Sequence, residues 1–520
     1  MEILMEQVRI NQMGKEITNQ FVIEEDFNVP DNKEDIGRII TGEGRIRIEE
    51  IKHMESYLKM CGKLHFKILY VTDTAIPTLA SMEGQIPVEE LVYVESEENE
   101  EYQLKINRIH FRATMIHSRK VEVKAITELS LHWENTCSEE ISIGVEAETP
   151  QVYQKKKVAE IMELHDKKKD IYRIREEVSL PGTKENIEKI IWEEVSLRKL
   201  ETKLSEEKLI LNGELQVFCI YQTGDDKMDW IEQMVPFEGQ LEFHGADSDF
   251  YHHVSRNLAE VHLEVKMDED GEMRIIGVEA VLELRVLIYK ERKLELLEDA
   301  YSLQMECEAK KRHIFLEELL MQSHSRCKIV EKVQIPEIRE EILQICHTSG
   351  ELQVEKTEVT PAGIYVEGIL HINFLYVKAN DQIPFDVWSG MVPFSYLIEC
   401  DQAKLDIGYD ITTGIEQLNI ELVGSGEVEV KAYLAFHSLL RNPLNIETIS
   451  EIQYRPFEEK AWTKKPGIIG YMVRTEDDLW TLAKKYGTTE ESIIEINSLS
   501  SKCLKEGEKI LILKENVSIL

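Results

Sequence analysis

The chain has 520 residues, 42% of them apolar, and its 98 acidic against 61 basic residues leave a formal charge of −37. This length predicts several domains, because single hydrophobic cores stop growing beyond about 250–300 residues. The acidic excess argues against a nucleic-acid-binding protein, since phosphates would be repelled by such a surface.

The amino terminus has no features of an export signal. Glu2 and Glu6 stand where such a signal needs a cationic start followed by an apolar run. No uncharged apolar segment approaches the ~18 residues of a membrane span. We therefore expect a soluble protein that is intracellular when made.

The eight cysteines are scattered and include no C-x-x-C pair. This spacing fits neither a zinc ribbon nor the dense disulfide framework of a small secreted domain. We expect reduced and mostly buried thiols.

One pattern occurs three times along the chain. Gly62, Gly213 and Gly368 are each followed by Leu after two residues and Tyr after eight, and a proline precedes each glycine by 32 residues. The distances between the glycines, 151 and 155 residues, predict three tandem domains of one fold. Since each glycine stands where a strand begins, we expect a bulge or a close backbone approach there.

The sequence pattern of each copy predicts mainly β-strands. Segments such as RIRIEEI, KLHFKILYV and KVEVKAITELSL alternate apolar and polar residues, as half-buried antiparallel strands do. Isoleucines six and nine residues after each proline, Ile36 and Ile39 in the first copy, predict a short helical turn.

The segments between the copies have a different spacing. YQKKKVAEIMELHDKK and EAKKRHIFLEELLMQSHS show helical periodicity, so we expect a helical linker before the second and third modules. After the third copy, a segment rich in Pro and Asn predicts an extended linker. The predicted organisation is a first module over 18–150, a second over 151–300, a third over 310–440, a linker over 441–466 and a small domain over 467–516.

The residues shared by the copies do not indicate catalysis, which needs converging polar side chains. His65 and His371 correspond, but Gln216 takes their place in the second copy, which argues against a metal site. The adjacent His252 and His253 leave a metal open as an alternative, although neighbouring side chains on a strand point to opposite faces. We predict a non-enzymatic protein with no catalytic residues, no cofactor and no metal.

The carboxyl-terminal segment 471–513 predicts a strand, two helices and a final strand. Asp477 or Asp478 can cap the helix LWTLAKKYG, which ends at Gly487. Thr489 can cap the second helix, whose first turn carries two glutamates.

This segment resembles a LysM domain. The Asn-x-Leu of that family is matched at Asn497, and LKEGEKILI matches its closing turn and strand. LysM domains that bind N-acetylglucosamine chains use two turns, whose usual Gly-Asp-Thr and Pro-Gly-Gln are replaced here by Glu-Asp-Asp and Glu-Gly-Glu. Because an uncharged sugar prefers neutral polar groups and an apolar floor, these replacements favour a basic protein partner. The predicted partner-binding residues are Glu476, Asp477, Asp478, Trp480, Asn497, Glu506, Gly507 and Glu508.

Three β modules followed by a LysM domain resemble the SPOCS family of clostridial spore-coat morphogenetic proteins. The resemblance implies a protein made in the mother cell, located at the forespore surface, whose LysM domain binds the coat morphogenetic ATPase and whose modules recruit or build coat layers. The alternative is a cell-wall protein that binds peptidoglycan, against which the missing export signal weighs.

Overall fold

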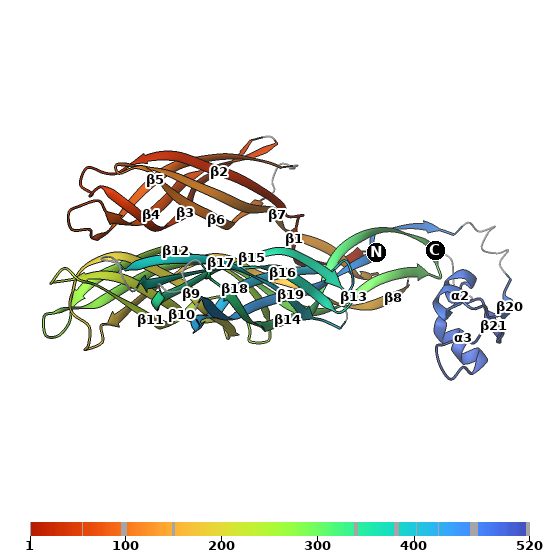
Figure 1. Ribbon diagram of the computed structural model, residues 1–520. Helices are drawn as coiled ribbons and strands as arrows, with labels where there is room; N and C mark the ends of the chain where they lie inside the picture. The colour runs from red at the N-terminus through yellow and green to blue at the C-terminus, as the bar shows by residue number, and fades with distance from the viewer. Residues whose placement is uncertain are drawn as a thin grey trace.

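The computed structural model describes residues 2–54, 56–94, 101–147, 151–336, 342–378, 384–401, 403–424, 426–457 and 466–515. Three elongated modules of antiparallel strands lie beside one another, and a small domain with two helices sits at one end (Figure 1). The mainly β fold class is confirmed. Among the described residues, no helix is long and apolar enough to cross a membrane.

Modules 2 and 3 are each a sandwich of two three-stranded antiparallel sheets, and module 1 has one three-stranded and one four-stranded sheet. Apart from one extra strand at the start of module 1, every copy has six strands. The second, third and fourth strands form one sheet, and the fifth, sixth and first strands form the other. The sheets of module 2 have the orders β11-β10-β9 and β12-β13-β8. Its strands are β8 (Val152–Ser179), β9 (Ile187–Ser205), β10 (Lys208–Thr223), β11 (Met228–Glu242), β12 (Tyr251–Met267) and β13 (Met273–Ser302).

Modules 1 and 3 repeat this arrangement, with one extra strand, β1, paired to β7 in module 1. The strands of module 1 are β1 (Glu2–Met13), β2 (Ile17–Asn28), β3 (Ile36–Met54), β4 (Tyr57–Thr72), β5 (Leu79–Tyr93), β6 (Glu101–His117) and β7 (Lys120–Glu146). Those of module 3 are β14 (Met305–Gln334), β15 (Ile342–Thr360), β16 (Gly363–Lys378), β17 (Phe385–Glu399), β18 (Gly408–Gly424) and β19 (Glu427–Pro456).

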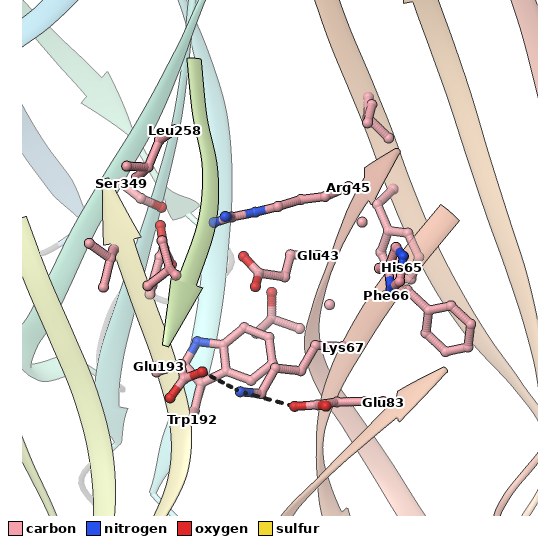
Figure 2. Close-up of a pocket in the computed structure, with 18 of the residues that line it drawn as sticks. Glu43, Arg45, His65, Phe66, Lys67, Glu83, Trp192, Glu193, Leu258 and Ser349 are labelled. Atoms are coloured by element: carbon pink, nitrogen blue, oxygen red, sulfur yellow. Dashed lines mark ion pairs between the residues drawn. The ribbon is translucent and has the colours of Figure 1, made fainter. Parts of the chain in front are cut away.

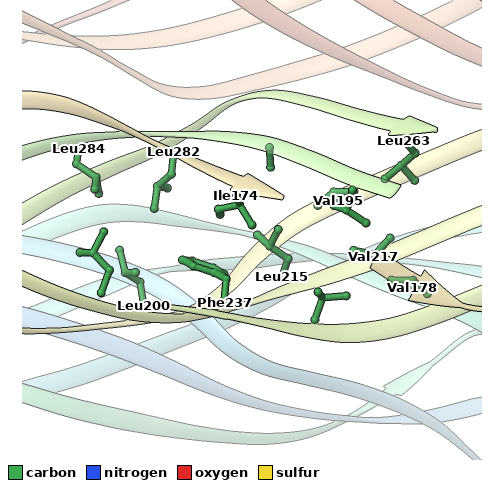
Figure 3. Close-up of a cluster of buried hydrophobic side chains, with 14 of the residues drawn as sticks. Ile174, Val178, Val195, Leu200, Leu215, Val217, Phe237, Leu263, Leu282 and Leu284 are labelled. Atoms are coloured by element: carbon green, nitrogen blue, oxygen red, sulfur yellow. The ribbon is translucent and has the colours of Figure 1, made fainter. Parts of the chain in front are cut away.

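The core of each sandwich comes from the inward side of the alternating strands. In module 2, Leu215 and Val217 of β10 face Ile174 and Leu282 of the opposite sheet (Figure 3). Each fully buried side chain of this size contributes about 1.5–3 kcal/mol. The alternation stops at Gln216, and residues 215–221 of β10 are all buried because a neighbouring module covers the outer face.

The repeated glycine has the expected role, although each copy lies inside its strand and not, as predicted, where the strand begins. A side chain at Gly62 or Gly368 would overlap a carbonyl oxygen of the neighbouring strand, and one at Gly213 would lie 2.9 Å from Lys199 O. The register of the strand pair shifts at or next to each of these glycines. A β-bulge and a close approach of the two strand backbones therefore occur together at or next to each of these glycines.

The expected helical turn of the isoleucines is wrong. Ile36 and Ile39 lie on β3 and contact the same core, although residues three apart on a regular strand face opposite ways. Register shifts after Ile36 and after Ile39 change the alternation by one residue. A bulged strand thus produces the same spacing as a helix.

The modules surround an approximate three-fold axis. Leu69, Ile220 and Leu375 occupy the same position in the three copies, seven residues after the repeated glycine, and they meet in one buried cluster. A single chain thereby forms the arrangement that three separate subunits of a trimer would form.

The helical linkers predicted before modules 2 and 3 are also wrong, because both segments are strands. β8 pairs with β13 over residues 152–179, and β14 pairs with β19 over residues 305–334. The predicted linker 441–466 is a strand as far as Pro456, and its residues 458–465 lie outside the described ones. Long-range pairing overrides the local spacing at each of these places.

The long strands extend beyond the sandwiches as three two-stranded ribbons, which we call the stalk. Its ribbons join residues 2–13 with 134–146, 152–164 with 289–302, and 305–319 with 441–456. Apolar side chains of all three ribbons meet inside it, among them Val8, Ile141, Ile161, Leu296 and Ile314. The stalk therefore holds the three modules together at one end.

Candidate partner-binding face of the terminal domain

The small terminal domain consists of β20 (Ile468–Met472), α2 (Leu479–Tyr486), α3 (Glu490–Asn497) and β21 (Lys509–Leu513). Asp478 caps α2 by accepting a hydrogen bond from Thr481 N at 2.7 Å, and Thr489 caps α3 in the same way through Ser492 N. Gly487 ends α2 in the left-handed conformation, with φ of 71°. The predicted caps and helix end are confirmed.

Two turns of this domain lie side by side. Val473 N donates to Glu508 O, and Gly507 N donates to Val473 O, both at 2.9 Å. These bonds fix the turn 505–508 against the residue that precedes the turn 474–478. Gly507 has φ of 79°, a conformation that favours glycine.

Several of the predicted partner-binding residues hold the domain together. Asp477 accepts a hydrogen bond from Arg474 N at 2.7 Å, which closes its turn. The side chain of Asn497 donates to Leu511 O and accepts from Leu511 N, both at 2.7 Å, and also donates to Ile493 O. Asn497 therefore joins α3 to β21.

The acidic side chains of the two turns differ in exposure. Glu476 and Glu506 are exposed, with no ion pair to a described residue. Glu508 is half-buried and accepts a hydrogen bond from Lys505 N at 3.2 Å. Two carboxylates are thus fully available to a partner on this face.

Trp480 does not lie on the same exposed face, because it is buried against the end of module 2. Its Nε1 donates to Asp299 Oδ2 at 2.8 Å, and its ring meets that of Tyr301 edge to face, with centroids 4.8 Å apart. Lys484 Nζ lies 2.7 and 2.8 Å from the two oxygens of Asp299. The contact therefore combines ring packing with charged hydrogen bonds.

Two further contacts join the terminal domain to module 2. The hydroxyl of Tyr301 donates to Thr488 O at 2.9 Å, and Lys155 Nζ lies 3.3 Å from Asp478 Oδ2. Burial alone would raise the pKa of Asp478, but hydrogen bonds from Thr481 and Lys155 lower it. The cap of α2 is thus held in its charged form first by Thr481 of its own helix and then by Lys155 of module 2.

No pattern in the sequence predicts this contact surface on module 2. Lys155 lies in the segment predicted as a helical linker, Asp299 lies at the end of the predicted second module, and Tyr301 lies just beyond it. The partners of Asp299 and Tyr301 stand 181 and 187 residues further along the chain, and the partner of Lys155 stands 323 residues further. No local pattern connects positions so far apart.

The histidines considered for metal binding lie in different environments. His252 and His253 are buried, and their Nε2 atoms are hydrogen-bonded to the hydroxyls of Thr202 and Thr412 at 2.9 and 3.0 Å. His371 is hydrogen-bonded to Arg108. Within the described residues, no three or more His, Cys, Asp or Glu side chains are grouped so as to hold a metal ion.

All eight cysteines are free. Four of them are buried, three are half-buried, and Cys503 in the terminal domain is exposed.

Comparison with protein families identifies both kinds of domain. The family model described as SipL, SPOCS domain matches residues 35–116, 186–268 and 341–423, and the LysM domain model matches residues 471–512. The chain is a three-repeat SPOCS protein with a LysM domain. Both are non-catalytic domain families. No curated protein and no solved structure matches the chain.

The SPOCS matches coincide with a definite part of each sandwich. They cover β3 to β6, β9 to β12 and β15 to β18. The first and last strands of each sandwich, which continue into the stalk, lie largely outside the matches. In this chain the SPOCS repeat is therefore completed by strands that also join the repeats to one another.

Proposed function

We propose that this protein is a non-enzymatic assembly adaptor of the spore coat, which binds a coat morphogenetic ATPase through its LysM domain. Three SPOCS repeats followed by a LysM domain support a role in sporulation. The observation that carries the choice of a protein ligand is the pair of exposed carboxylates, Glu476 and Glu506, on the turns that bind sugar in glycan-binding LysM domains. Unpaired carboxylates suit a basic protein surface better than a neutral glycan.

The residues proposed for partner binding divide into two groups. Glu476, Glu506 and the half-buried Glu508 contact the partner, whereas Asp477, Asn497 and Gly507 shape the turns that present them. Trp480 and Asp478 act indirectly, since they fix the LysM domain on module 2. The partner therefore meets a LysM domain of fixed orientation.

Charge reversal tests this proposal. Glu476→Lys with Glu506→Lys should weaken binding to the purified coat ATPase at least tenfold at low ionic strength, because two attractions become repulsions. The matched control reverses two exposed glutamates of α3, Glu491→Lys with Glu495→Lys, and should bind as the parent does. If both variants bind the coat ATPase with the same affinity, the acidic turns are not part of the interface.

The LysM match also favours a second candidate, a protein that binds peptidoglycan. Co-sedimentation with purified peptidoglycan distinguishes the two, because the adaptor is expected to remain in the supernatant. A fluorescent fusion in sporulating cells should form a shell around the forespore. A signal at the cell wall, together with sedimentation that the charge reversals do not change, would favour the glycan ligand.

A further inference from the structure

A large hollow lies between module 1 and modules 2 and 3, beside the buried cluster of Leu69, Ile220 and Leu375 where the three modules meet. Modules 2 and 3 touch directly, for example through the hydrogen bond from Arg198 to Thr348 O. The side of module 1 that faces them is instead bridged by long charged side chains, such as Arg47, which reaches Glu260. The space left between them has a volume of about 2360 Å³. In Figure 2, Arg45 extends from module 1 into this space.

Strand edges line the hollow over long uninterrupted stretches. Residues 39–48 of β3, 104–113 of β6 and 256–263 of β12 all contribute. Among the described residues, each of these strands is hydrogen-bonded on one side only, to β4, β7 and β13 respectively. Their other edges have no hydrogen-bonded strand partner among the described residues. β3 and β6 contact each other there through Phe111, and an added strand can use the backbone donors and acceptors that these edges leave free.

The charge of the lining is opposite to that of the chain as a whole. Eleven Lys or Arg side chains and eight Glu side chains line the hollow, against 61 and 98 in the complete sequence. Six of the cations form no ion pair and no hydrogen bond with a described residue. These are Arg45, Lys105, Arg112, Arg173, Lys189 and Arg256.

Only one carboxylate of the lining likewise lacks an ion pair and a hydrogen bond with a described residue. This is the carboxylate of Glu43, and burial raises its pKa to about 7 although Arg45 is near. Partial burial also brings the pKa of Arg256 to about 10. Five of these six cations are exposed, Arg256 is half-buried, and none has a counter-charge among the described residues, so an anion entering the hollow would be attracted to them.

Apolar side chains stand beside the cations. Phe111, Trp192 and Leu258 belong to the same lining. An extended segment presents its side chains alternately to opposite sides. A strand with acidic and apolar residues in alternation could therefore place carboxylates on the cations and apolar groups on these three side chains.

We propose that this hollow binds an extended acidic segment of a partner polypeptide, which pairs as an additional strand with a free edge of module 1. The geometry selects polypeptide over other polyanions because the lining presents free strand edges. This site is separate from the LysM domain, and its occupancy does not depend on the proposed coat ATPase.

Binding of a dye-labelled (Glu-Val)₅ peptide to the full chain, followed by fluorescence anisotropy at low ionic strength, tests the proposal. The peptide should bind, whereas (Lys-Val)₅ should not. Methylating alternate backbone nitrogens of (Glu-Val)₅ should weaken binding at least tenfold, because it removes donors from one edge of the strand.

Charge reversal locates the site. Lys105→Glu with Arg112→Glu changes two exposed side chains of β6 and should weaken binding of (Glu-Val)₅ at least tenfold. The matched control, Lys203→Glu with Lys332→Glu, makes the same change of net charge outside the hollow and should leave binding unchanged. The proposal is overturned by absence of (Glu-Val)₅ binding, by equal binding of the methylated or lysine peptide, or by equal affinity of the two reversed chains.

Discussion

Replacing Asp299 by alanine should release the LysM domain from module 2. Asp299 accepts hydrogen bonds from Trp480 Nε1 and from Lys484 Nζ, and it lies on β13 at the end of the stalk. Without the carboxylate, the buried indole N–H loses its acceptor and the lysine loses its counter-charge. The ring contact with Tyr301 remains.

The magnitude follows from the two lost interactions. Leaving a buried donor unsatisfied costs about 1–3 kcal/mol. The ion pair with Lys484 is partly exposed, with 37% and 20% of the two side chains accessible, and such pairs contribute about 0.2–1 kcal/mol. The docked state should lose about 1–4 kcal/mol, which corresponds to roughly a fivefold to 700-fold change in the docking equilibrium.

Fluorine NMR of the 5-fluorotryptophan-labelled chain measures this change. The Trp480 signal, assigned from Trp480→Phe, should acquire the solvent isotope shift of an exposed indole in Asp299→Ala. The control is Glu295→Ala, which removes an exposed carboxylate of the same strand without contact to the LysM domain. If Trp480 remains buried in Asp299→Ala, the carboxylate does not hold the two domains together.

Two further predictions concern the modules. Gly213→Ala should cost about 1–3 kcal/mol of unfolding free energy in urea titration, because the new methyl group meets the ring of Phe237 and a backbone oxygen, whereas Gly182→Ala, with open space around it, should not. Burial lowers the pKa of His252 and His253 to about 4. Since the unfolded chain titrates near 6.5 and so binds more protons between these values, stability should fall as the pH drops from about 6.5 to 4, by up to roughly 3 kcal/mol per histidine. Thermal unfolding across this range should be less pH-dependent in His252→Gln, and an unchanged slope would contradict the assignment.

The parts of the fold that the sequence predicts are those decided by local chemistry. Asp478, Gly487 and Thr489 act on backbone groups within three or four residues, so their caps can be inferred from neighbours alone. The repeated Gly213 is similar, because its spacing from the proline is kept in all three copies.

The parts that the sequence does not predict depend on distant partners. The strand β8 has helical spacing, yet it pairs with β13 more than 100 residues away. Trp480 could be core or interface from its position on α2, and only the placement of Asp299 decides between them. The hollow beside module 1 is likewise a property of how the modules assemble, which no single repeat encodes.

The continuity of β13 has a mechanical consequence. Its 30 residues run without interruption from the sandwich of module 2 to the contact with the LysM domain. At about 3.3 Å per residue, such a strand spans nearly 100 Å when extended. A protein lattice bound to the LysM domain would therefore lie at a fixed distance from a layer bound to the opposite ends of the modules. The chain would act as a stiff spacer between the two layers.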